Sequence, residues 1–550
     1  MYIRFLTSKN CARTKMRVEV QFKQTSPASR GWVIGHRSPV LSKVEASSRL
    51  SKENMATGII ADNQFLYLMS RSILALILGF LFSCDPKPDS KTEAQSKPNV
   101  IFILADDLGY GDVGFMGNQI IETPNIDRLA EESLVFTQHY SGNTVCAPSR
   151  SAWITGLHTG HTPIRGNKEV QPEGQYPMPD TLMTIPKLMK QAGYVTGGFG
   201  KWGLGFIGTS GDPMSQGFDQ FYGYNCQRYA HRYYPGHIWD NDQKVELPEN
   251  GWENKVTYAP DLIHQQSLEF MEENRDNPFF LFLPIIMPHA ELAAPEDEIF
   301  EKYRQKIGEE KPHIGGKAAD YGPDMNIGAY QSQPYPRATH AAMVERIDRY
   351  VGEVIAKLEE LGVRENTLIF FASDNGPHRE GGHDPDFFDS NGLYRGYKRD
   401  LYEGGIRTYL IANWPGVIDG GRESDHSSAF WDMLPTLAEL TGQEPPKTDG
   451  VSFLPTLMNQ EEQKKHEYLY WEFHELGGRQ AIRQGDWKLV KLNVKNPGET
   501  KVELYNIAED PGEERDLAVD FPEKVEELVS LIEEAHQPNS IFPLFESEKE

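Results

Sequence analysis

The sequence predicts an α/β fold in which helices flank a large, mixed, mostly parallel sheet, followed by a smaller antiparallel sheet and a helix. Three observations predict it: apolar runs recur, helical patterns separate them, and the pattern changes after about residue 455. Residues 100–105, 279–283, 368–372 and 409–412 form the apolar runs. Because these runs lack the alternation of a half-exposed strand, they fit parallel strands that are buried on both faces.

The helical patterns complete the alternation that defines this class. They lie at residues 181–192, 261–273 and 341–361. Beyond residue 455, short aromatic strands are expected at residues 468–473, 481–483, 487–492 and 503–505, with a closing helix near 522–536. We therefore expect a catalytic α/β domain at 99–454 and a C-terminal α+β subdomain at 455–550. Residues 305–337, rich in Gly, Pro and Tyr, read as an excursion that shapes the mouth of the site.

The first 98 residues differ from the rest of the chain. Residues 1–68 carry 11 Lys and Arg against 4 Asp and Glu, whereas the whole chain has a net charge of -25. From Met69, a short basic segment, an apolar run and Ser83-Cys84 are typical of a signal peptide, and the run is too short to span a bilayer. The end of this segment resembles the lipobox of bacterial lipoproteins, which implies lipidation of Cys84.

Four segments follow from this interpretation. Residues 1–68 are expected to be an extension that arose from start-codon choice, although a start at Met55 or an unusual leader is the alternative. Residues 69–84 are expected to be the lipoprotein signal, and the polar residues 85–98 a flexible tether. The protein is then exported to a bacterial periplasm or cell surface and anchored there by its lipid.

Composition excludes several classes of protein. At 550 residues, 39% hydrophobic and 25% charged, the chain is of the soluble globular kind rather than disordered. Its net charge of -25 argues against a nucleic-acid partner, which would need a basic surface. Of the four cysteines, Cys11 precedes the expected start, Cys84 is the lipid site and Cys146 lies in a motif, so no structural disulfide is expected.

Two acidic clusters follow predicted strands. Asp106 and Asp107 come after the first, and Asp374 and Asn375 come after the third. Such residues commonly cap helices or begin turns. However, carboxylates that converge at one sheet edge repel one another unless a cation neutralises them, and oxygen ligands suit calcium or magnesium better than zinc.

The segment Thr144-Val145-Cys146-Ala147-Pro148-Ser149-Arg150 carries the most specific signal. An isolated cysteine is usually a small buried hydrophobe. Here, however, the segment resembles the signature Cys-x-Pro-Ser-Arg of type I sulfatases, in the alkaline phosphatase superfamily. Further motifs of that family follow in order, and the resemblance covers roughly residues 98–535: Asp106-Asp107-Leu108-Gly109-Tyr110-Gly111-Asp112, Gly200-Lys201-Trp202, Ser373-Asp374-Asn375-Gly376 and Tyr397-Lys398-Arg399-Asp400.

The resemblance implies a site and a mechanism. A formylglycine-generating or anaerobic sulfatase-maturing enzyme would oxidise Cys146 to formylglycine, whose hydrate attacks sulfur, releases the alcohol and then expels sulfate. One calcium ion would be held by Asp106, Asp107, Asp374, Asn375 and the modified Cys146. Arg150, Lys201 and Lys398 would contact the nucleophile or the sulfate, and cations near the sulfate oxygens favour the reaction physically.

Histidines raise two further questions. A sugar alcohol leaves poorly without a proton, and His289, in Met287-Pro288-His289, is the expected donor. The alternative is a histidine bound only to backbone after a strand. Many relatives also carry a histidine two residues after the lysine, where this chain has Gly203. His158, His161 and His378 are the candidates to replace it or to bind substrate, and the sequence does not choose among them.

A stretch of aromatic and cationic residues at 222–242 suits a sulfated sugar ring, although packing onto the core explains it equally well. It includes Arg228 and His231, and Arg379 lies beside His378. Together with His383 and with Trp471, Glu472, Phe473 and His474, these residues are expected to form a pocket for one terminal sugar. We thus expect exo action on sulfated algal or host polysaccharide fragments, such as those of ulvan, carrageenan or other sulfated galactans.

Two other functions are weighed against this one. A phosphatase or phosphonate-ester hydrolase of the same superfamily would share the fold and the metal, but phosphate's second charge favours two metals. A calcium-dependent glycan-binding lipoprotein would keep Cys146 as a thiol, but binding alone does not need a placed nucleophile.

Overall fold

The computed structural model describes residues 97–549 except residue 172 and residues 251–253 and 316–329. The expected extension, signal segment, lipid site at Cys84 and nearly all of the tether lie outside the described residues. Within them, none of the helices combines the length and the apolar character that a bilayer crossing requires.

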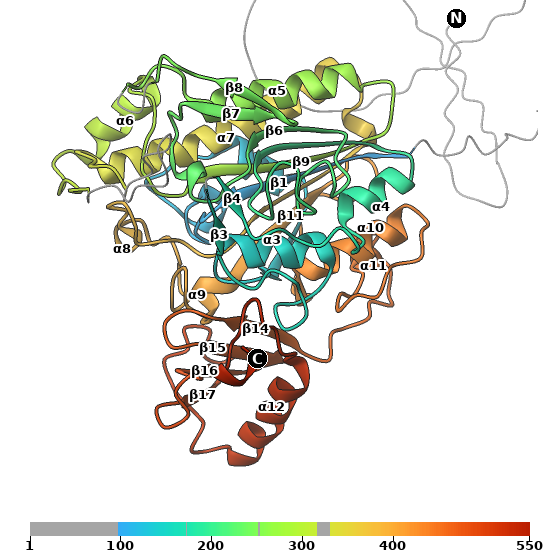
Figure 1. The fold of residues 1–550 in the computed structure, drawn as a ribbon, viewed down its shortest axis with the longest axis vertical. Helices are drawn as coiled ribbons and strands as arrows, with labels where there is room; N and C mark the ends of the chain where they lie inside the picture. The colour runs from blue at the N-terminus through green and yellow to red at the C-terminus, as the bar shows by residue number, and fades with distance from the viewer. Residues whose placement is uncertain (1–96, 172, 251–253, 316–329, 550) are drawn as a thin grey trace, which may run out of the picture. The chain divides into compact units, whose positions relative to one another are not determined.

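A large mixed sheet lies at the centre of the described unit (Figure 1). β1 (Asn99–Asp106) lies between β10 (Thr367–Ser373) and β9 (Phe279–Pro288), and both neighbours are parallel to it. β5 (Val195–Lys201) and β6 (Gln220–Tyr224) extend the parallel part. The remaining strands are β2 (Leu134–Tyr140), β7 (His237–Asp240), β8 (Gln243–Glu246), β11 (Arg407–Asn413), β12 (Arg422–Ser424) and β13 (Ser428–Ala429).

The apolar runs form this sheet because helices cover both of its faces. On β1, Ile101 and Ile103 pack into the core beneath α5 (Ala259–Glu273) and α7 (Pro336–Glu360). Phe102 and Leu104 face the opposite core, beneath α3 (Cys146–Thr155), α4 (Ile185–Gln191) and α10 (Met433–Leu440). Alternate residues of one strand therefore fill two separate cores, which accounts for the unbroken apolar sequence.

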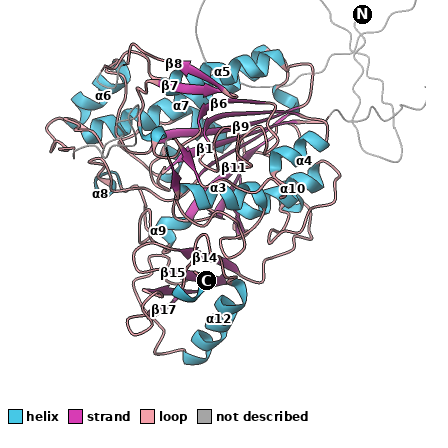
Figure 2. Cartoon of the chain, viewed as in Figure 1, coloured by secondary structure: helices cyan, strands magenta, loops and turns pink. Residues whose placement is uncertain are grey.

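The other helices are short or peripheral (Figure 2). They are α2 (Pro124–Glu131), α6 (Glu298–Ile307), α8 (Pro385–Phe388), α9 (Glu403–Ile406) and α11 (Leu454–Leu457). A two-stranded sheet of β3 (Glu169–Val170) and β4 (Gly174–Gln175) completes this part.

One strand runs against the expectation. β11, which contains the run at residues 409–412, is antiparallel to both of its neighbours, β10 and β2. Burial on both faces requires an apolar composition but does not set the direction of a strand, so the sequence pattern could not predict that β11 is antiparallel. The sheet is mixed, as the fold class allowed.

The C-terminal part is a four-stranded antiparallel sheet with one long helix. β14 (Leu469–Phe473), β15 (Arg479–Gln484), β16 (Trp487–Leu492) and β17 (Lys501–Asn506) follow one another in space as in sequence. Tyr470 and Ile482 face α12 (Pro522–Ala535), whereas Trp471 and Ala481 pack toward the larger sheet. The fold class expected from the sequence is confirmed.

An imidazole joins the end of α12 to the core of this subdomain. His536 Nδ1 lies 2.6 Å from Glu472 of β14, and its Nε2 lies 2.8 Å from Glu548. Burial lowers the pKa of His536, but the two carboxylates outweigh burial and raise it above its ordinary value. The protonated ring therefore bridges two carboxylates that would otherwise repel each other.

We predict that His536→Gln destabilises the protein more at pH 5.5 than at pH 9. Because the folded pKa is raised, the stabilisation is complete below the unfolded pKa and is lost as pH rises through the folded pKa. The loss at low pH should be about 1.5–3 kcal/mol, the range for hydrogen bonds to charged groups. Denaturant unfolding at both pH values measures it. Glu548→Gln should weaken the same pH dependence, and equal losses at both pH values would contradict the bridge.

Candidate active site

The polar residues singled out after the strands meet at one edge of the large sheet. Asp106 ends β1, Lys201 ends β5 and Asp374 follows β10. His289 follows β9 in the same way. Because these four strands are parallel, their carboxyl ends lie side by side, the usual location of a ligand site in an open α/β sheet.

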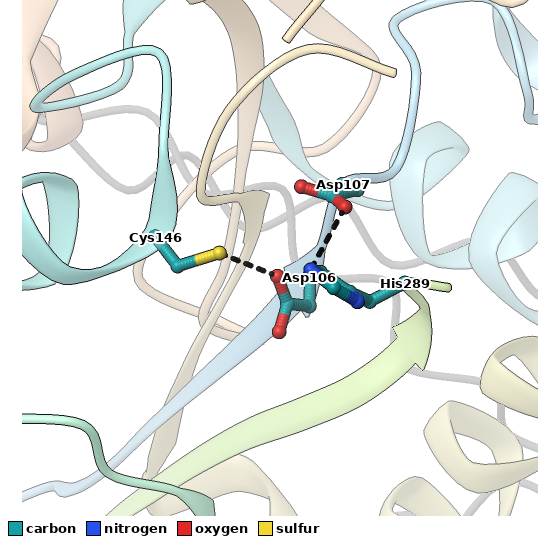
Figure 3. A group of neighbouring side chains, drawn as sticks. All are labelled: Asp106, Asp107, Cys146 and His289. Carbon is teal, nitrogen blue, oxygen red and sulfur yellow. Dashed lines mark hydrogen bonds and ion pairs between the residues drawn. The ribbon is translucent and has the colours of Figure 1, made fainter. Parts of the chain in front are cut away.

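Cys146 is the first residue of α3 and points into this cluster (Figure 3). Its side chain is buried, its Sγ donates to Asp106 Oδ1 at 3.3 Å, and Lys201 Nζ lies 3.4 Å from the sulfur. Burial and Asp106 raise the pKa of the thiol far above its ordinary value, despite the charges of Lys201 and Lys398. An unmodified Cys146 is thus a protonated thiol rather than a nucleophilic thiolate.

Three buried carboxylates alternate with three buried cations around the sulfur. Lys201 Nζ lies 2.6 Å from Asp106, and Lys398 Nζ lies 2.8 Å from Asp107. Arg150 reaches Asp374 at 3.0 Å and Asp106 at 3.2 Å. Isolated charges would be very costly here, and mutual pairing makes their burial tolerable.

Two observations show that the carboxylate group fits a hard cation. Burial and the charge of Asp106 raise the pKa of Asp374 to about 7, a sign of crowded acidic oxygens. Asn375 Oδ1 is buried and has no hydrogen-bond partner among the described residues, while its Nδ2 donates to Asp107 at 2.7 Å. Carboxylate and amide oxygens are calcium ligands. Asp106, Asp107, Asp374 and Asn375 are therefore the residues that would hold calcium.

His289 lies beside this group on the side of Lys398. Its Nε2 is 2.8 Å from Lys398 Nζ and 3.5 Å from Asp107 Oδ2, and its Nδ1 contacts the carbonyl of Ala290. Burial, followed by the positive charges of Lys398 and Lys201, lowers the pKa of His289 well below its ordinary value. Donation from Nδ1 to Ala290 leaves the Nε2 lone pair to accept from Lys398.

Two residues of the aromatic stretch contact this histidine. His231 stacks on the ring of His289, with centroids 4.6 Å apart. Tyr233 is fully buried and donates its hydroxyl to the carbonyl of His289 at 2.7 Å. Thus His231 lies at the site, while Tyr233 packs in the core and fixes the backbone.

Glu380 is a site residue that the sequence reasoning missed. It lies 3.6 Å from Lys398 Nζ, pairs with Arg399 and accepts from Tyr330 at 2.6 Å. Burial raises its pKa, but Lys398 and Arg399 hold the pKa far below its ordinary value. Its position two residues after His378 was the available signal.

Gly203 stands where a histidine was expected, and the structure explains the substitution. Its backbone has φ of 77°, and a Cβ there would lie 1.9 Å from Gln227 Nε2. The backbone conformation disfavours a residue with a Cβ, and such a residue would also require the side chain of Gln227 to move. Of the proposed replacements, His378 is nearest, at 6.0 Å between ring centroids from His289.

The other two replacement candidates lie away from the nucleophile. His158 and His161 come after the C-terminal end of α3, whereas Cys146 begins it, and ten helical residues span about 15 Å. His161 Nδ1 lies 2.9 Å from Asp449, and His158 stacks on His161. The hypothesis that His158 or His161 acts at the reacting centre is therefore wrong, because both residues lie beyond the end of α3 opposite to Cys146.

The expected pocket also needs correction. Trp471 and Phe473 are buried in an apolar cluster, and the buried Glu472 pairs with Arg165 at 3.1 Å and with His474 at 3.0 Å. Arg228 pairs with Glu169 at 3.2 Å. Arg379, 53% exposed, pairs with Asp386 at 2.8 Å on the surface.

The chain matches the family model described as Sulfatase over residues 98–443, and that of N-sulphoglucosamine sulphohydrolase, C-terminal, over residues 391–537. It is 30% identical to the steryl-sulfatase of Rattus norvegicus, over 72% of this chain and 76% of that protein. It is 31% identical to the N-acetylgalactosamine-6-sulfatase of Mus musculus, over 69% and 68%.

The chain is also similar to proteins of known structure. Ps i-CgsB is 28% identical with a TM-score of 0.66, and the match covers 82% of this chain and 96% of that one. That protein has also been solved in complex with k-i-k-neocarrahexaose. The phosphonate monoester hydrolase of Agrobacterium radiobacter, 19% identical with a TM-score of 0.54 over 81% and 99% of the chains, is similar in fold alone.

We predict that chelation of calcium lowers the melting temperature and that calcium restores it better than magnesium does. The reason is that Asp106, Asp107 and Asp374 repel one another without a cation. Calorimetric titration of the chelated protein measures binding. Asp374→Ala should abolish calcium binding, whereas Asp386→Ala, on the surface, should leave it intact. A chelated protein of unchanged stability would contradict this assignment.

Proposed function

This chain belongs to the sulfatase family and hydrolyses sulfuric esters, and we propose that it removes sulfate from sulfated carbohydrates with a nucleophile made from Cys146. One observation carries the proposal. Cys146 Sγ lies within 3.4 Å of both the Asp106 carboxylate and the Lys201 ammonium, at the N-terminus of α3. An oxygen nucleophile at that position would lie beside the cation-binding carboxylates and a positive charge.

Each charged residue of the site has its own role in this proposed reaction. Formylglycine and calcium would supply the oxygen nucleophile and the Lewis acid that draws charge from sulfate. Lys201 and Lys398 point their ammonium groups at the same cluster and stabilise the charge that grows on the sulfate oxygens. Arg150 holds Asp374 and Asp106 in place, so the carboxylates keep their geometry.

His289 is our proposed proton donor to the leaving alcohol. It lies next to Lys398, and its ring is held by stacking on His231 and by a contact with its neighbouring carbonyl. A negatively charged substrate would offset the positive field of the lysines and favour protonation of the ring. His378 is not poised as a base, because Nδ1 accepts from the Glu380 amide and Nε2 lies 3.2 Å from the Pro288 carbonyl.

We propose fragments of sulfated algal or host polysaccharides as substrates, such as those of ulvan, of carrageenan or of other sulfated galactans. Two relatives support sulfated saccharides: one is named N-acetylgalactosamine-6-sulfatase and one has been solved in complex with k-i-k-neocarrahexaose. Exo action on a terminal sugar, export as a lipoprotein anchored at Cys84 and conversion of Cys146 by a maturing enzyme belong to the same proposal. Together they describe a bacterial enzyme that desulfates glycans outside the cytoplasm.

The position of Lys398 argues against the phosphatase and phosphonate-hydrolase alternative. Its ammonium lies within 2.8 Å of both Asp107 and His289 and 3.6 Å from Glu380, groups that could otherwise hold a second metal. A fixed single charge matches the monoanion of a sulfate ester, whereas a phosphate dianion favours two metals. A calcium-dependent glycan-binding lipoprotein without catalysis would not need a nucleophile placed at Cys146.

Mass spectrometry of the tryptic peptide from Leu129 to Arg150 tests the nucleophile. In protein from a host with the maturing enzyme, we expect the mass of an aldehyde in place of the thiol at Cys146. Cys146→Ala should reduce turnover of an aryl sulfate to background. Fully active protein with an unmodified thiol, or faster turnover of an aryl phosphate than of the aryl sulfate, would contradict the proposal.

The role of His289 predicts a dependence on the leaving group. His289→Asn should lower kcat on a sugar sulfate by about 10²–10⁴-fold, the usual contribution of a general acid. The loss should be much smaller for an aryl sulfate whose phenolate leaves without a proton. His264→Asn, on α5 and paired with Glu353, is the control. Equal losses on both substrates would assign His289 to substrate binding instead.

A further inference from the structure

A second cluster of side chains that could bind a metal ion lies next to the active site. Asp112 comes from the loop after β1, His340 from α7 and His383 from the loop after β10. Their candidate ligand atoms all lie within 4.8 Å of one another, and the three side chains are 0%, 0% and 5% exposed. His340 lies 6.5 Å from His378 between ring centroids, so the cluster borders the catalytic loops.

The two histidines have no hydrogen-bond partner among the described residues. This holds for both Nδ1 and Nε2 of His340 and of His383. Each imidazole carries at least one N–H, and a buried polar group without a partner costs about 1–3 kcal/mol. Buried polar groups in folded proteins are nearly always satisfied, so each of these rings is expected to have a partner, either an ordered water or an ion.

Hydrogen bonds fix the carboxylate of Asp112 beside these two histidines. Its Oδ1 accepts from the Ser390 hydroxyl at 2.5 Å and its Oδ2 from the Gly109 amide at 2.8 Å. His340 Nε2 lies 3.7 Å from Oδ2, which is too long for a hydrogen bond. Such second contacts typically orient a carboxylate that also binds a metal.

Charge decides what kind of ligand fits. The cluster combines two imidazole rings with the carboxylate of Asp112, and all three side chains are buried. An anionic ligand would be repelled, whereas a cation would satisfy both kinds of group.

We propose that Asp112, His340 and His383 form a second metal site, for zinc, separate from the calcium site. Two imidazoles and one carboxylate are a ligand set that zinc prefers and that calcium, which takes oxygen ligands, does not. The two rings stack with centroids 3.7 Å apart and planes at 25°. They would turn about χ2, a soft torsion, to point their lone pairs at one ion, and a water would complete the tetrahedron.

Such an ion would brace the active site. It would tie α7 to the loop after β1, which contains Asp107, and to the loop after β10, which contains His378 and Glu380. It would contact neither the nucleophile nor the substrate, so the proposal stands independently of the proposed function.

Metal analysis of the purified full chain tests this inference. We expect about one zinc per chain besides calcium, since structural zinc sites bind one ion. His340→Asn and His383→Asn should each lower the zinc content at least about tenfold, the usual effect of damaging a metal site, while calcium content stays the same. Cobalt exchanged into the wild-type protein should give the visible absorption of a tetrahedral nitrogen and oxygen site, and His340→Asn should remove it.

His161→Asn is the matched variant, because His158, His161 and Asp449 form another group of ligand atoms within 4.8 Å. Zinc lost from His161→Asn but retained in His340→Asn would overturn the proposal. Wild-type protein purified without chelator and lacking zinc would also overturn it, and a buried water would then be the partner of the two rings. This wild-type measurement decides the matter even if the variants fail to fold.

Discussion

Every feature of the active site depends on the need to neutralise charges that are buried together. Asp106, Asp107 and Asp374 are inaccessible to water, and so are Lys201 and Arg150. Taking any one of these charges out of water alone would cost several kcal/mol. The alternation of acid and base around Cys146 removes most of that cost. Burial, followed by the charge of Asp106, still raises the pKa of Asp374 to about 7, so the neighbouring cations do not fully stabilise this carboxylate as an anion. A divalent cation is the physical complement of this arrangement.

The parallel strands make this arrangement possible. Each contributes one or two polar residues where its apolar run ends, so side chains separated by as many as 268 residues come within hydrogen-bond distance, as Asn375 and Asp107 do. The same geometry gives α3 its place, with Cys146 at its N-terminus facing the strand ends. The helix dipole adds a favourable field for an anionic oxygen there.

Residues that lie in a contiguous motif or directly after an apolar run can be assigned from the sequence. The central strands and the C-terminal sheet are predicted by hydrophobic periodicity, and the cluster around Cys146 is predicted by local motifs. The prediction that Trp471, Glu472 and Phe473 line a sugar pocket, which rested on their aromatic and acidic character, is wrong. Trp471 and Phe473 pack in an apolar cluster instead, and Glu472 is held in buried ion pairs, since which face of a strand is buried depends on what packs against it.

The sequence by itself determined the sheet's apolar strands, the order of the motifs and the chemistry available at Cys146, because these are properties of neighbouring residues. Only the tertiary structure decided that β11 runs antiparallel, that Glu380 reaches Lys398 and that His158 and His161 lie beyond the far end of α3. It also showed that Gln227 fills the space beside Gly203. Contacts between residues distant in sequence depend on the packing of whole elements, and no local pattern encodes them.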